Sequence, residues 1–308
     1  MTTTSRLTRT YLAVPAHRAR MVEGAAASAA DAVFMDLEDA VPLAEKGAAL
    51  QGATTALTEL DWGTKTVAVR LNAFDSPSIR IEIASLGRIP RLDAFIIPKA
   101  ETVADVVKIG RWIKDARGMR DKPAEMELLI ETARGLVNVE ALAAADHLVT
   151  ALHLGVGDFA ASIGARSAEI GASPSGYRHV GNAAEGHPEV PLDLFAYPMM
   201  RLLVAARAFG LRAIDGPCGA FRDEIATGST AMKAAAMGYD GKQVIHPSQI
   251  EPTRAAFVPS EQELAYAERA LAALEEAERN GQGAVTVDGK MVDYANIRMI
   301  RRLMSFKD

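Results

Sequence analysis

Two carboxylates in this sequence follow short apolar runs of the kind that form buried strands. Glu131 ends the run ELLIE and Asp158 follows the run ALHLGVG, and a small-residue or helix-opening segment comes after each acid. If the two runs are adjacent parallel strands, the helix between them fits one strand-helix unit and both acids lie at the same rim. Two hard oxygen ligands suit Mg²⁺, which keeps several waters and leaves room for substrate oxygens. The pair therefore predicts a magnesium site, with Mn²⁺ as the alternative ion.

A barrel is the scaffold that the rest of the chain predicts for these acids. Eight apolar segments alternate with Ala-rich helical segments, and no glycine fingerprint of a doubly wound sheet stands out. This pattern favours an α/β fold of the (β/α)₈ TIM barrel type over an open sheet, with the barrel covering residues 1–255. The predicted strands are residues 11–15, 32–38, 66–72, 94–99, 127–131, 151–157, 211–216 and 242–247.

Two segments depart from this alternation. A polar, Gly/Pro-rich stretch at residues 172–193 follows Asp158, and a loop of that length on a functional rim predicts a binding or lid element. Residues 256–308 contain a long helix, SEQELAYAERALAALEEAERN, and then a turn-rich segment with a short helix. We expect this C-terminal helical extension to act as a lid on the rim of its own barrel or of a neighbouring subunit.

Composition narrows the class of protein. A chain of 308 residues that is 49% hydrophobic can form one large domain with a modest appendage. The net charge of −5 argues against a nucleic-acid binder. No apolar run has membrane-spanning length, and the first ten residues lack the apolar centre of a secretory signal. The single cysteine, Cys218, fits a reducing compartment, so we expect a cytoplasmic protein.

Charged residues also follow the other predicted strands. Asp36, Glu38 and Asp39 come at the end of the second strand, Arg70 in the third and Lys99 at the end of the fourth. Polar groups at the carboxyl ends of several strands are typical of a barrel's reaction site. An arginine beside a cation can hold a carboxylate with two hydrogen bonds and stabilise a developing alkoxide. We assign the three acids a supporting role, either ordering metal-bound water or bonding a helix start.

Nine short motifs together resemble a known family. The chain resembles the HpcH/HpaI aldolase and citrate lyase β-subunit family from about Tyr11 to its end, and is most similar to the branch of malyl-CoA and citramalyl-CoA lyases. The motifs occur in the family's order, and they are YLAVPAHRARM, VFMDLEDAV, VRLN, IPKAE, IETARG, GVGDFAASIG, AIDGP, GKQVIHPSQI and GAVTVDGKMVD.

The resemblance implies a role for each matching residue. Glu131 and Asp158 would hold Mg²⁺, and Arg70 would contact the carboxylate and carbonyl of a 2-keto acid. Asp293 would be the acid/base group, supplied across the interface of a homotrimer or hexamer. Arg18 would help to hold the nucleotide end of coenzyme A.

The coenzyme A motif departs from the family's pattern. The family has PGDRPERF where this chain has PAHRARM, so His17 replaces an aspartate and Ala19 replaces a proline. Lys99 is a further candidate for binding the substrate or coenzyme A, because it lies at a strand tip. The chemistry needs no Schiff-base lysine.

The implied reaction is cleavage of a 3-hydroxyacyl-CoA, of the malyl-CoA or citramalyl-CoA type, into an acyl-CoA such as acetyl-CoA and a 2-keto acid, glyoxylate or pyruvate. The metal would polarise the oxygen beside the substrate carboxylate, Arg70 would share its charge, and Asp293 would protonate the enolate carbon. Two alternatives stay open. One is a thioester hydrolase on the same scaffold, and the other is a citrate lyase β-like subunit that acts on a carrier-protein thioester.

Each residue also has a plainer interpretation. The acids at positions 131 and 158 could only complement helix N-termini. Arg70 could pair with a neighbouring acid, and Arg18 and Lys99 could be solvated charges. Asp293 flanks VDGKM, which on its own predicts an ordinary hairpin turn.

Overall fold

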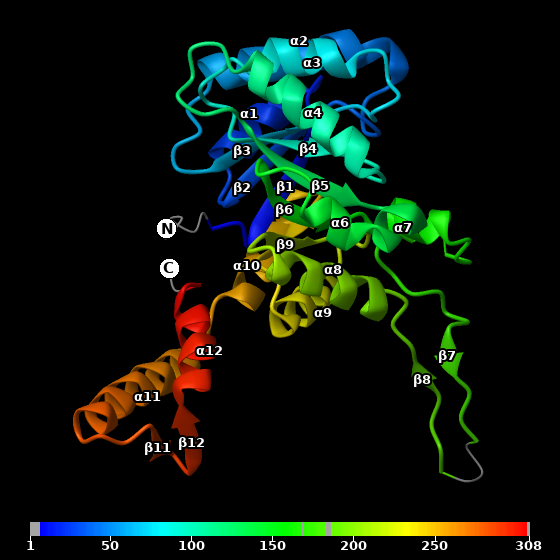
Figure 1. The fold of residues 1–308 in the computed structure, drawn as a ribbon. Helices are drawn as coiled ribbons and strands as arrows, with labels where there is room; N and C mark the ends of the chain where they lie inside the picture. Colours follow the sequence, from blue (N-terminus) through cyan, green and yellow to red (C-terminus); the bar gives the residue numbers. More distant parts are fainter. Residues whose placement is uncertain (1–6, 168, 183–185, 307–308) are drawn as a thin grey trace.

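Eight parallel strands form a closed barrel in this computed structural model, which describes residues 7–167, 169–182 and 186–306. The order around the barrel is β1-β10-β9-β6-β5-β4-β3-β2, which confirms the predicted (β/α)₈ architecture (Figure 1). The barrel strands are β1 (Thr10–Pro15), β2 (Ala32–Asp36), β3 (Thr66–Arg70), β4 (Ala94–Ile97), β5 (Glu125–Ile130), β6 (Val149–Leu154), β9 (Arg212–Asp215) and β10 (Gly241–Val244).

Helices follow the strands and cover the outside of the barrel (Figure 1). They are α1 (Ala19–Ala27), α2 (Lys46–Glu59), α3 (Ile79–Leu86), α4 (Val103–Ala116), α5 (Ala133–Val137), α6 (Val139–Ala143), α7 (Val156–Ser162), α8 (Ala196–Ala208), α9 (Glu224–Met237) and α10 (Ile250–Phe257). Short 3₁₀ turns, η1 (Leu43–Glu45) and η3 (Pro247–Gln249), precede α2 and α10. Among the described residues, no helix is both long enough and apolar enough to cross a membrane.

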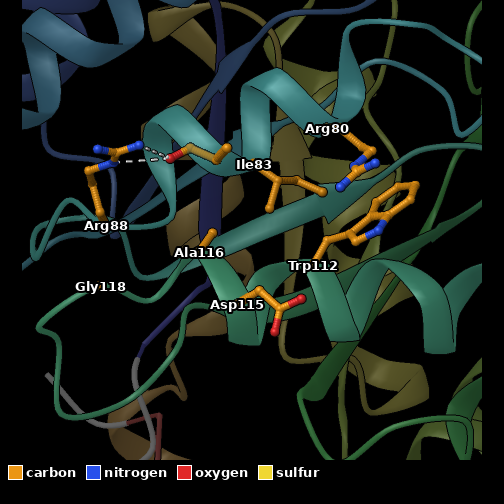
Figure 2. A pocket seen from close by; sticks show the side chains of 8 residues that line it. Arg80, Ile83, Arg88, Trp112, Asp115, Ala116 and Gly118 are labelled. Carbon is orange, nitrogen blue, oxygen red and sulfur yellow. Dashed lines mark hydrogen bonds between the residues drawn. The ribbon is translucent and has the colours of Figure 1, made fainter.

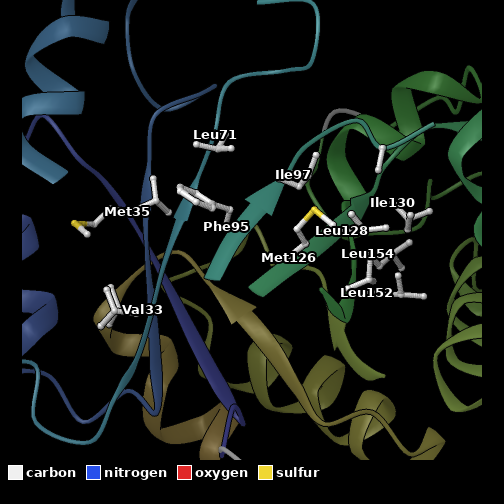
Figure 3. Close-up of a cluster of buried hydrophobic side chains, with 14 of the residues drawn as sticks. Val33, Met35, Leu71, Phe95, Ile97, Met126, Leu128, Ile130, Leu152 and Leu154 are labelled. Atoms are coloured by element: carbon white, nitrogen blue, oxygen red, sulfur yellow. The ribbon is translucent and has the colours of Figure 1, made fainter. Parts of the chain in front are cut away.

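Alternation along each strand separates two cores. Side chains such as Val33, Met35, Leu128 and Ile130 point outward and pack under the helices (Figure 3). The intervening positions point into the barrel, where they form a second and smaller cluster. That interior cluster contains Tyr11, Ala32, Phe34, Ala68, Ala94, Ile96, Leu129 and Ile214. Strands buried on both faces explain why the sequence showed continuous apolar runs.

Most strands end earlier than predicted. β2 ends at Asp36, β4 at Ile97 and β6 at Leu154, two to three residues before the predicted ends. The third strand ends at Arg70, two residues before its predicted end. The charged residues beyond these ends therefore stand on loops or on the first turn of a helix, where they are free of the sheet's hydrogen-bonding pattern.

The polar stretch at residues 172–193 contains a small hairpin. Strands β7 (Arg178–His179) and β8 (Val190–Pro191) pair antiparallel. The hairpin extends away from the barrel instead of folding back over it (Figure 1). The start of the same connection does reach the rim, where Ile170 lines the cavity described below.

The C-terminal extension forms an arm with its own core. It consists of α11 (Glu261–Arg279), the antiparallel hairpin β11 (Ala284–Val287) and β12 (Lys290–Asp293), and α12 (Tyr294–Met304). A small cluster that includes Leu274, Val292 and Ile300 holds these elements together. The boundary expected at residue 255 lies within α10, two residues before its end.

The arm meets its own barrel at the amino-terminal end of β10. Arg302 Nη2 lies 2.9 Å from Asp240 Oδ1 and donates to the Gly238 carbonyl at 3.0 Å. Phe306 packs against Phe257 with ring centroids 6.3 Å apart. These residues lie opposite the rim that carries the predicted site, so the arm does not cover the site of its own barrel (Figure 1).

A buried polar network lies inside the barrel below the site. Glu127 Oε1 lies 2.7 Å from Arg212 Nη2, and its Oε2 lies 2.8 Å from His153 Nε2. Burial by itself raises the pKa of Glu127, but the charge of Arg212 and the His153 contact outweigh burial and hold the pKa at about 2. Because this value lies below that of the unfolded chain, the ionised Glu127 stabilises the fold above about pH 4.3, and this contribution is lost as the pH falls towards 2.

We expect Glu127→Gln to lower the free energy of unfolding by about 3 kcal/mol near neutral pH, because the largely buried Arg212 would lose the nearer of its two carboxylate partners and keep only Glu125, at 3.6 Å. Urea unfolding at pH 7, 5, 4 and 3 measures this effect, and the difference from wild type should shrink below about pH 4.3. Glu59→Gln, on an exposed position of α2, is the matched control and should change stability by less than about 0.5 kcal/mol. If the loss of unfolding free energy in Glu127→Gln were the same at every pH, altered packing and not the lost charge would be its cause.

Candidate active site

The carboxylates of Glu131 and Asp158 line the same cavity, as the predicted strand order requires. Glu131 follows β5 directly, and Asp158 lies in the first turn of α7, just after β6. β5 and β6 are neighbours, with Ile130 beside Leu154 at their ends. The cavity has a volume of about 390 Å³ and also contains Arg70. The carboxyl ends of β3, β5 and β6 therefore converge on one space.

The environment of Glu131 fits a bound cation. Its side chain is 3% exposed, and the backbone N–H of Lys99 donates to Oε1 at 2.8 Å. Burial, followed by the nearby charge of Glu38, raises the pKa of Glu131 to about 8. A carboxylate held in this way needs additional positive charge in order to ionise at neutral pH.

The donor set favours magnesium. Within the described residues, no group of three or more His, Cys, Asp or Glu side chains could hold a metal ion. The cavity instead offers Glu131 and the Asp158 side chain, which is 42% exposed. Two carboxylates that leave the other positions to water and substrate oxygens match the habit of Mg²⁺.

Arg70 is fixed by Asp36 with two hydrogen bonds. Its Nε and Nη2 donate to the two oxygens of Asp36, each at 2.7 Å. Asp36 also accepts from the backbone N–H groups of Glu38 at 2.8 Å and Ala40 at 3.0 Å. Although burial alone raises the pKa of Asp36, the Arg70 contacts bring it below its ordinary value. Arg70 does pair with an acid, as the plainer interpretation proposed, and it lines the cavity as well.

Lys99 lies within the acidic cluster. Its ammonium Nζ is 2.6 Å from Glu38 Oε1, 3.2 Å from Asp158 Oδ2 and 3.7 Å from Asp39 Oδ2. Burial tends to lower the pKa of Lys99, but the Glu38 contacts outweigh it and raise the pKa. Lys99 also adopts a φ of 49°, which is rare for a residue with a side chain. In this structure its ammonium contacts carboxylates, and its role in binding substrate or coenzyme A stays a prediction.

Glu38 connects the two cationic residues. Its Oε1 contacts Lys99, while Oε2 lies 3.4 Å from Arg70 Nη1. Burial raises the pKa of Glu38 even though both partners lower it. Asp39 is more exposed and stands 3.9 Å from Arg70 Nη1. Asp36, Glu38 and Asp39 therefore contact the cationic side chains of the cavity, and the supporting role expected for them stays a prediction.

Two predicted residues lie outside this cluster. Arg18 is exposed at the start of α1. Asp293 stands at the start of α12, where its Oδ1 accepts from the backbone N–H groups of Ala295 at 2.9 Å and Asn296 at 3.2 Å. Asp293 ends β12, and β12 and α12 lie away from β5, β6 and α7 (Figure 1). The structure thus gives Asp293 a helix-capping contact and does not bring it to the cavity of its own barrel.

Gly155 lies against the Glu131 side chain, a contact that the sequence interpretation missed. A Cβ at this position would overlap the Glu131 side chain, lying 2.6 Å from Oε2. Glycine therefore lets the carboxylate of Glu131 stand against the end of β6. The signal was present in the sequence as the glycine three residues before Asp158.

We expect Gly155→Ala to weaken Mg²⁺ binding by about 10- to 100-fold, because the methyl group displaces Glu131. The matched control is Gly157→Ala, where the nearest atom to an added Cβ is Ile170 Cγ1 at 3.8 Å, so this variant should keep the wild-type affinity. Isothermal titration with Mg²⁺ measures both. Equal affinities in the two variants would show that Glu131 does not depend on the space left by Gly155.

A second surface groove is separate from this site. It lies between α3 and α4, has a volume of about 340 Å³, and is lined by residues that include Arg80, Arg88, Trp112 and Asp115 (Figure 2). The Arg80 guanidinium stands 5.4 Å from the centre of the Trp112 indole ring. None of the predicted site residues lines this groove, so it does not compete as the reaction site.

Comparison with known proteins places the chain among relatives of similar length. It is 36% identical over 299 residues to the L-malyl-CoA/beta-methylmalyl-CoA lyase of Cereibacter sphaeroides, covering 96% of this chain and 92% of the relative. It is 35% identical to a (3S)-malyl-CoA thioesterase of Cereibacter sphaeroides, covering 96% and 93% of the two chains.

A solved structure is also similar over nearly its whole length. The protein CitE from Mycobacterium tuberculosis, in complex with magnesium, acetoacetate and coenzyme A, superposes with a TM-score of 0.74. The two chains are 31% identical, and the match covers 97% of this chain and 98% of CitE. Residues 9–247, which include the barrel with its paired carboxylates and its arginine, match the HpcH/HpaI aldolase/citrate lyase family. The chain therefore belongs to this family, and it is a carbon–carbon lyase.

Proposed function

We propose that this protein is a magnesium-dependent lyase that cleaves a 3-hydroxyacyl-CoA of the malyl-CoA or citramalyl-CoA type into acetyl-CoA and a 2-keto acid. The observation that carries the proposal is the meeting of Glu131, Asp158 and Arg70 in one cavity at the carboxyl ends of the barrel strands. The lyase relative, which matches at 36% identity over nearly the whole chain, supports the same reaction.

The residues of the cavity have separable tasks in this reaction. Glu131 and Asp158 would hold the magnesium ion, which supplies Lewis-acid polarisation of the keto-acid oxygen when bound. Arg70, oriented by Asp36, donates to the substrate carboxylate and to the oxygen on which charge develops. Lys99 and Glu38 form an ion pair beside these groups, so their opposite charges offset each other within the cavity.

The remaining step is proton transfer at the enolate carbon of acetyl-CoA. We assign it to Asp293 of a neighbouring subunit in a homotrimer or hexamer. The arm's departure from its own site supports this assignment, since Asp293 can then serve only another barrel unless the arm moves. Arg18, exposed at the start of α1, would meet the phosphates of coenzyme A at the rim.

The proposal also covers the identity of the metal ion and the location of the protein. Mn²⁺ would replace Mg²⁺, because the ligands are carboxylate oxygens that both ions accept. The single cysteine, Cys218, is buried and free, in keeping with a reducing compartment and the proposed cytoplasmic location.

One experiment separates this function from thioester hydrolysis, which the thioesterase relative makes the second candidate. The protein is incubated with malyl-CoA or citramalyl-CoA and Mg²⁺, and the products are identified by mass spectrometry. A lyase releases acetyl-CoA together with glyoxylate or pyruvate in equal amounts. Release of free coenzyme A and the intact hydroxy acid, without keto acid, would instead establish the hydrolase.

A further inference from the structure

One neutral polar side chain, that of Gln243, lines the cavity of the proposed lyase site. The other polar side chains on this cavity, within the described residues, are all charged. Gln243 lies on β10 and pairs with Tyr11 of β1, whose side chain belongs to the cluster inside the barrel. Paired residues of parallel strands share a face of the sheet, so the Gln243 side chain also points inward. Because Gln243 is only 6% exposed, its amide is held within the barrel and reaches the cavity from there.

The buried network below the cavity fixes the direction of this amide. Its Nε2 stands 2.9 Å from His153 Nδ1, and His153 Nε2 lies 2.8 Å from Glu127 Oε2. Glu127, whose pKa is about 2, is ionised at neutral pH and can only accept, so the imidazole hydrogen lies on Nε2. His153 Nδ1 is then the acceptor for the amide nitrogen of Gln243. These contacts leave the amide oxygen of Gln243 on the side of the cavity.

The amide oxygen of Gln243 is an unused acceptor. It accepts no hydrogen bond from any group in the part of the chain that the structure describes. It is not enclosed by protein atoms either, so a molecule in the cavity can reach it. A carbonyl oxygen accepts hydrogen bonds and cannot donate them. The cavity therefore offers a ligand one neutral acceptor, held in place by a chain of buried contacts.

The proposed substrate has one hydrogen-bond donor close to the bond that breaks. In a 3-hydroxyacyl-CoA of this type, the carboxylate and the thioester carbonyl only accept, and the hydroxyl group donates. Glu131 and Asp158 are committed to the metal ion in the proposed function, which leaves Gln243 as the neutral acceptor for that hydroxyl. After cleavage the same carbon carries a keto oxygen, which has no hydrogen to donate. A fixed acceptor therefore pairs with the hydroxy acid portion of the ester and not with the keto acid.

We infer that Gln243 Oε1 accepts a hydrogen bond from the substrate hydroxyl, so that Gln243 distinguishes the uncleaved 2-hydroxy acid portion from the 2-keto acid product. The inference rests on the proposed lyase function and adds a substrate-binding residue to it. His153 is a positioning residue in this arrangement, because it acts only by holding the amide nitrogen of Gln243. The contact exists before cleavage and is lost afterwards, so it holds the ester without retaining the keto acid.

Lactate and pyruvate test this contact, because one carries a hydroxyl group where the other carries a keto oxygen. Isothermal titration of the Mg²⁺-loaded protein gives the Kd of racemic lactate and of pyruvate without turnover. Gln243→Met keeps the length of the side chain but has no oxygen. It should raise the Kd of lactate by about 3- to 10-fold, while the Kd of pyruvate stays within about 2-fold of wild type. The control Gln51→Met, at an exposed position of α2, should leave both values unchanged.

The ratio of the two Kd values isolates the hydrogen bond, since a general loss of packing would raise both together. An unchanged ratio in Gln243→Met would overturn the inference, while keto-acid release by wild type would keep the lyase function standing. If wild type binds neither acid and releases no keto acid, the lyase function fails and the inference fails with it.

A crystal structure of wild type with Mg²⁺ and lactate gives a second test that does not depend on how methionine packs. The hydroxyl oxygen should lie within about 3.0 Å of Gln243 Oε1. A separation beyond about 3.5 Å, or a water molecule between the two oxygens, would show that Gln243 does not bind the hydroxyl.

Discussion

Replacing Glu131 by glutamine is expected to reduce kcat/KM for CoA-ester cleavage by about 10³-fold or more, because the polarising ion contributes several kcal/mol to the transition state. The amide is isosteric and remains able to accept the hydrogen bond from the Lys99 backbone, so the barrel should fold normally. Steady-state kinetics and Mg²⁺ titration calorimetry measure the two consequences. Turnover at the wild-type rate in this variant, or in wild type with excess chelator, would contradict the assignment.

The pKa of Glu131 gives the same variant a second signature in the metal-free protein. Burial first, and then Glu38, raise this pKa to about 8, above the value in the unfolded chain. The folded state therefore binds more protons than the unfolded state, and stability should fall as the pH rises from about 4.3 to 8. The Glu131→Gln variant should lack this dependence on pH. Adding Mg²⁺ should restore the stability that the wild-type protein loses at pH 8. Denaturant unfolding of both proteins at pH 5 and pH 8 checks the sign.

Asp293→Asn is expected to reduce turnover by about 10²- to 10⁴-fold, the usual contribution of a general acid or base, while binding of Mg²⁺ and CoA ester stays near the wild-type value. Asparagine is also a good helix N-cap, so α12 should keep its start and the arm its fold. This choice separates proton transfer from capping, which Asp293→Ala would not do. Loss of ligand binding in parallel with turnover would indicate that Asp293 is structural.

Mixing two inactive variants tests whether the site is shared between chains. Asp158→Asn disables the barrel site without burying an unpaired group, since its side chain is 42% exposed, and Asp293→Asn disables the arm. If the arm serves a neighbouring barrel, mixed oligomers contain some sites with both native residues, and partial activity should return after subunit exchange. Exchange verified by native mass spectrometry without recovered activity would place the complete site within one chain.

The fold followed from the sequence because its signals are local. Each barrel strand is buried on both faces, so an apolar run such as AVFMD marks it without knowledge of its neighbours. The ends of the strands were less well predicted. Gly155 and the residues after it continue the apolar run past Leu154, although the strand ends at Leu154 and α7 begins at Val156.

What the sequence by itself determined is the set of residue types at the strand tips: two acids on adjacent strands, an arginine on a third and the acids of the DLED segment. Closure of the barrel decided the rest, because it alone sets which side chains face one another. The bonding of Arg70 to Asp36, 34 residues away, and the place of Lys99 between Glu38 and Asp158 both join side chains that follow different strands. The direction of the arm was also beyond sequence reasoning, since it depends on the contact of Arg302 with Asp240, 62 residues away. Local patterns encode elements, but a shared site depends on distances between elements, and only the packed structure fixes those distances.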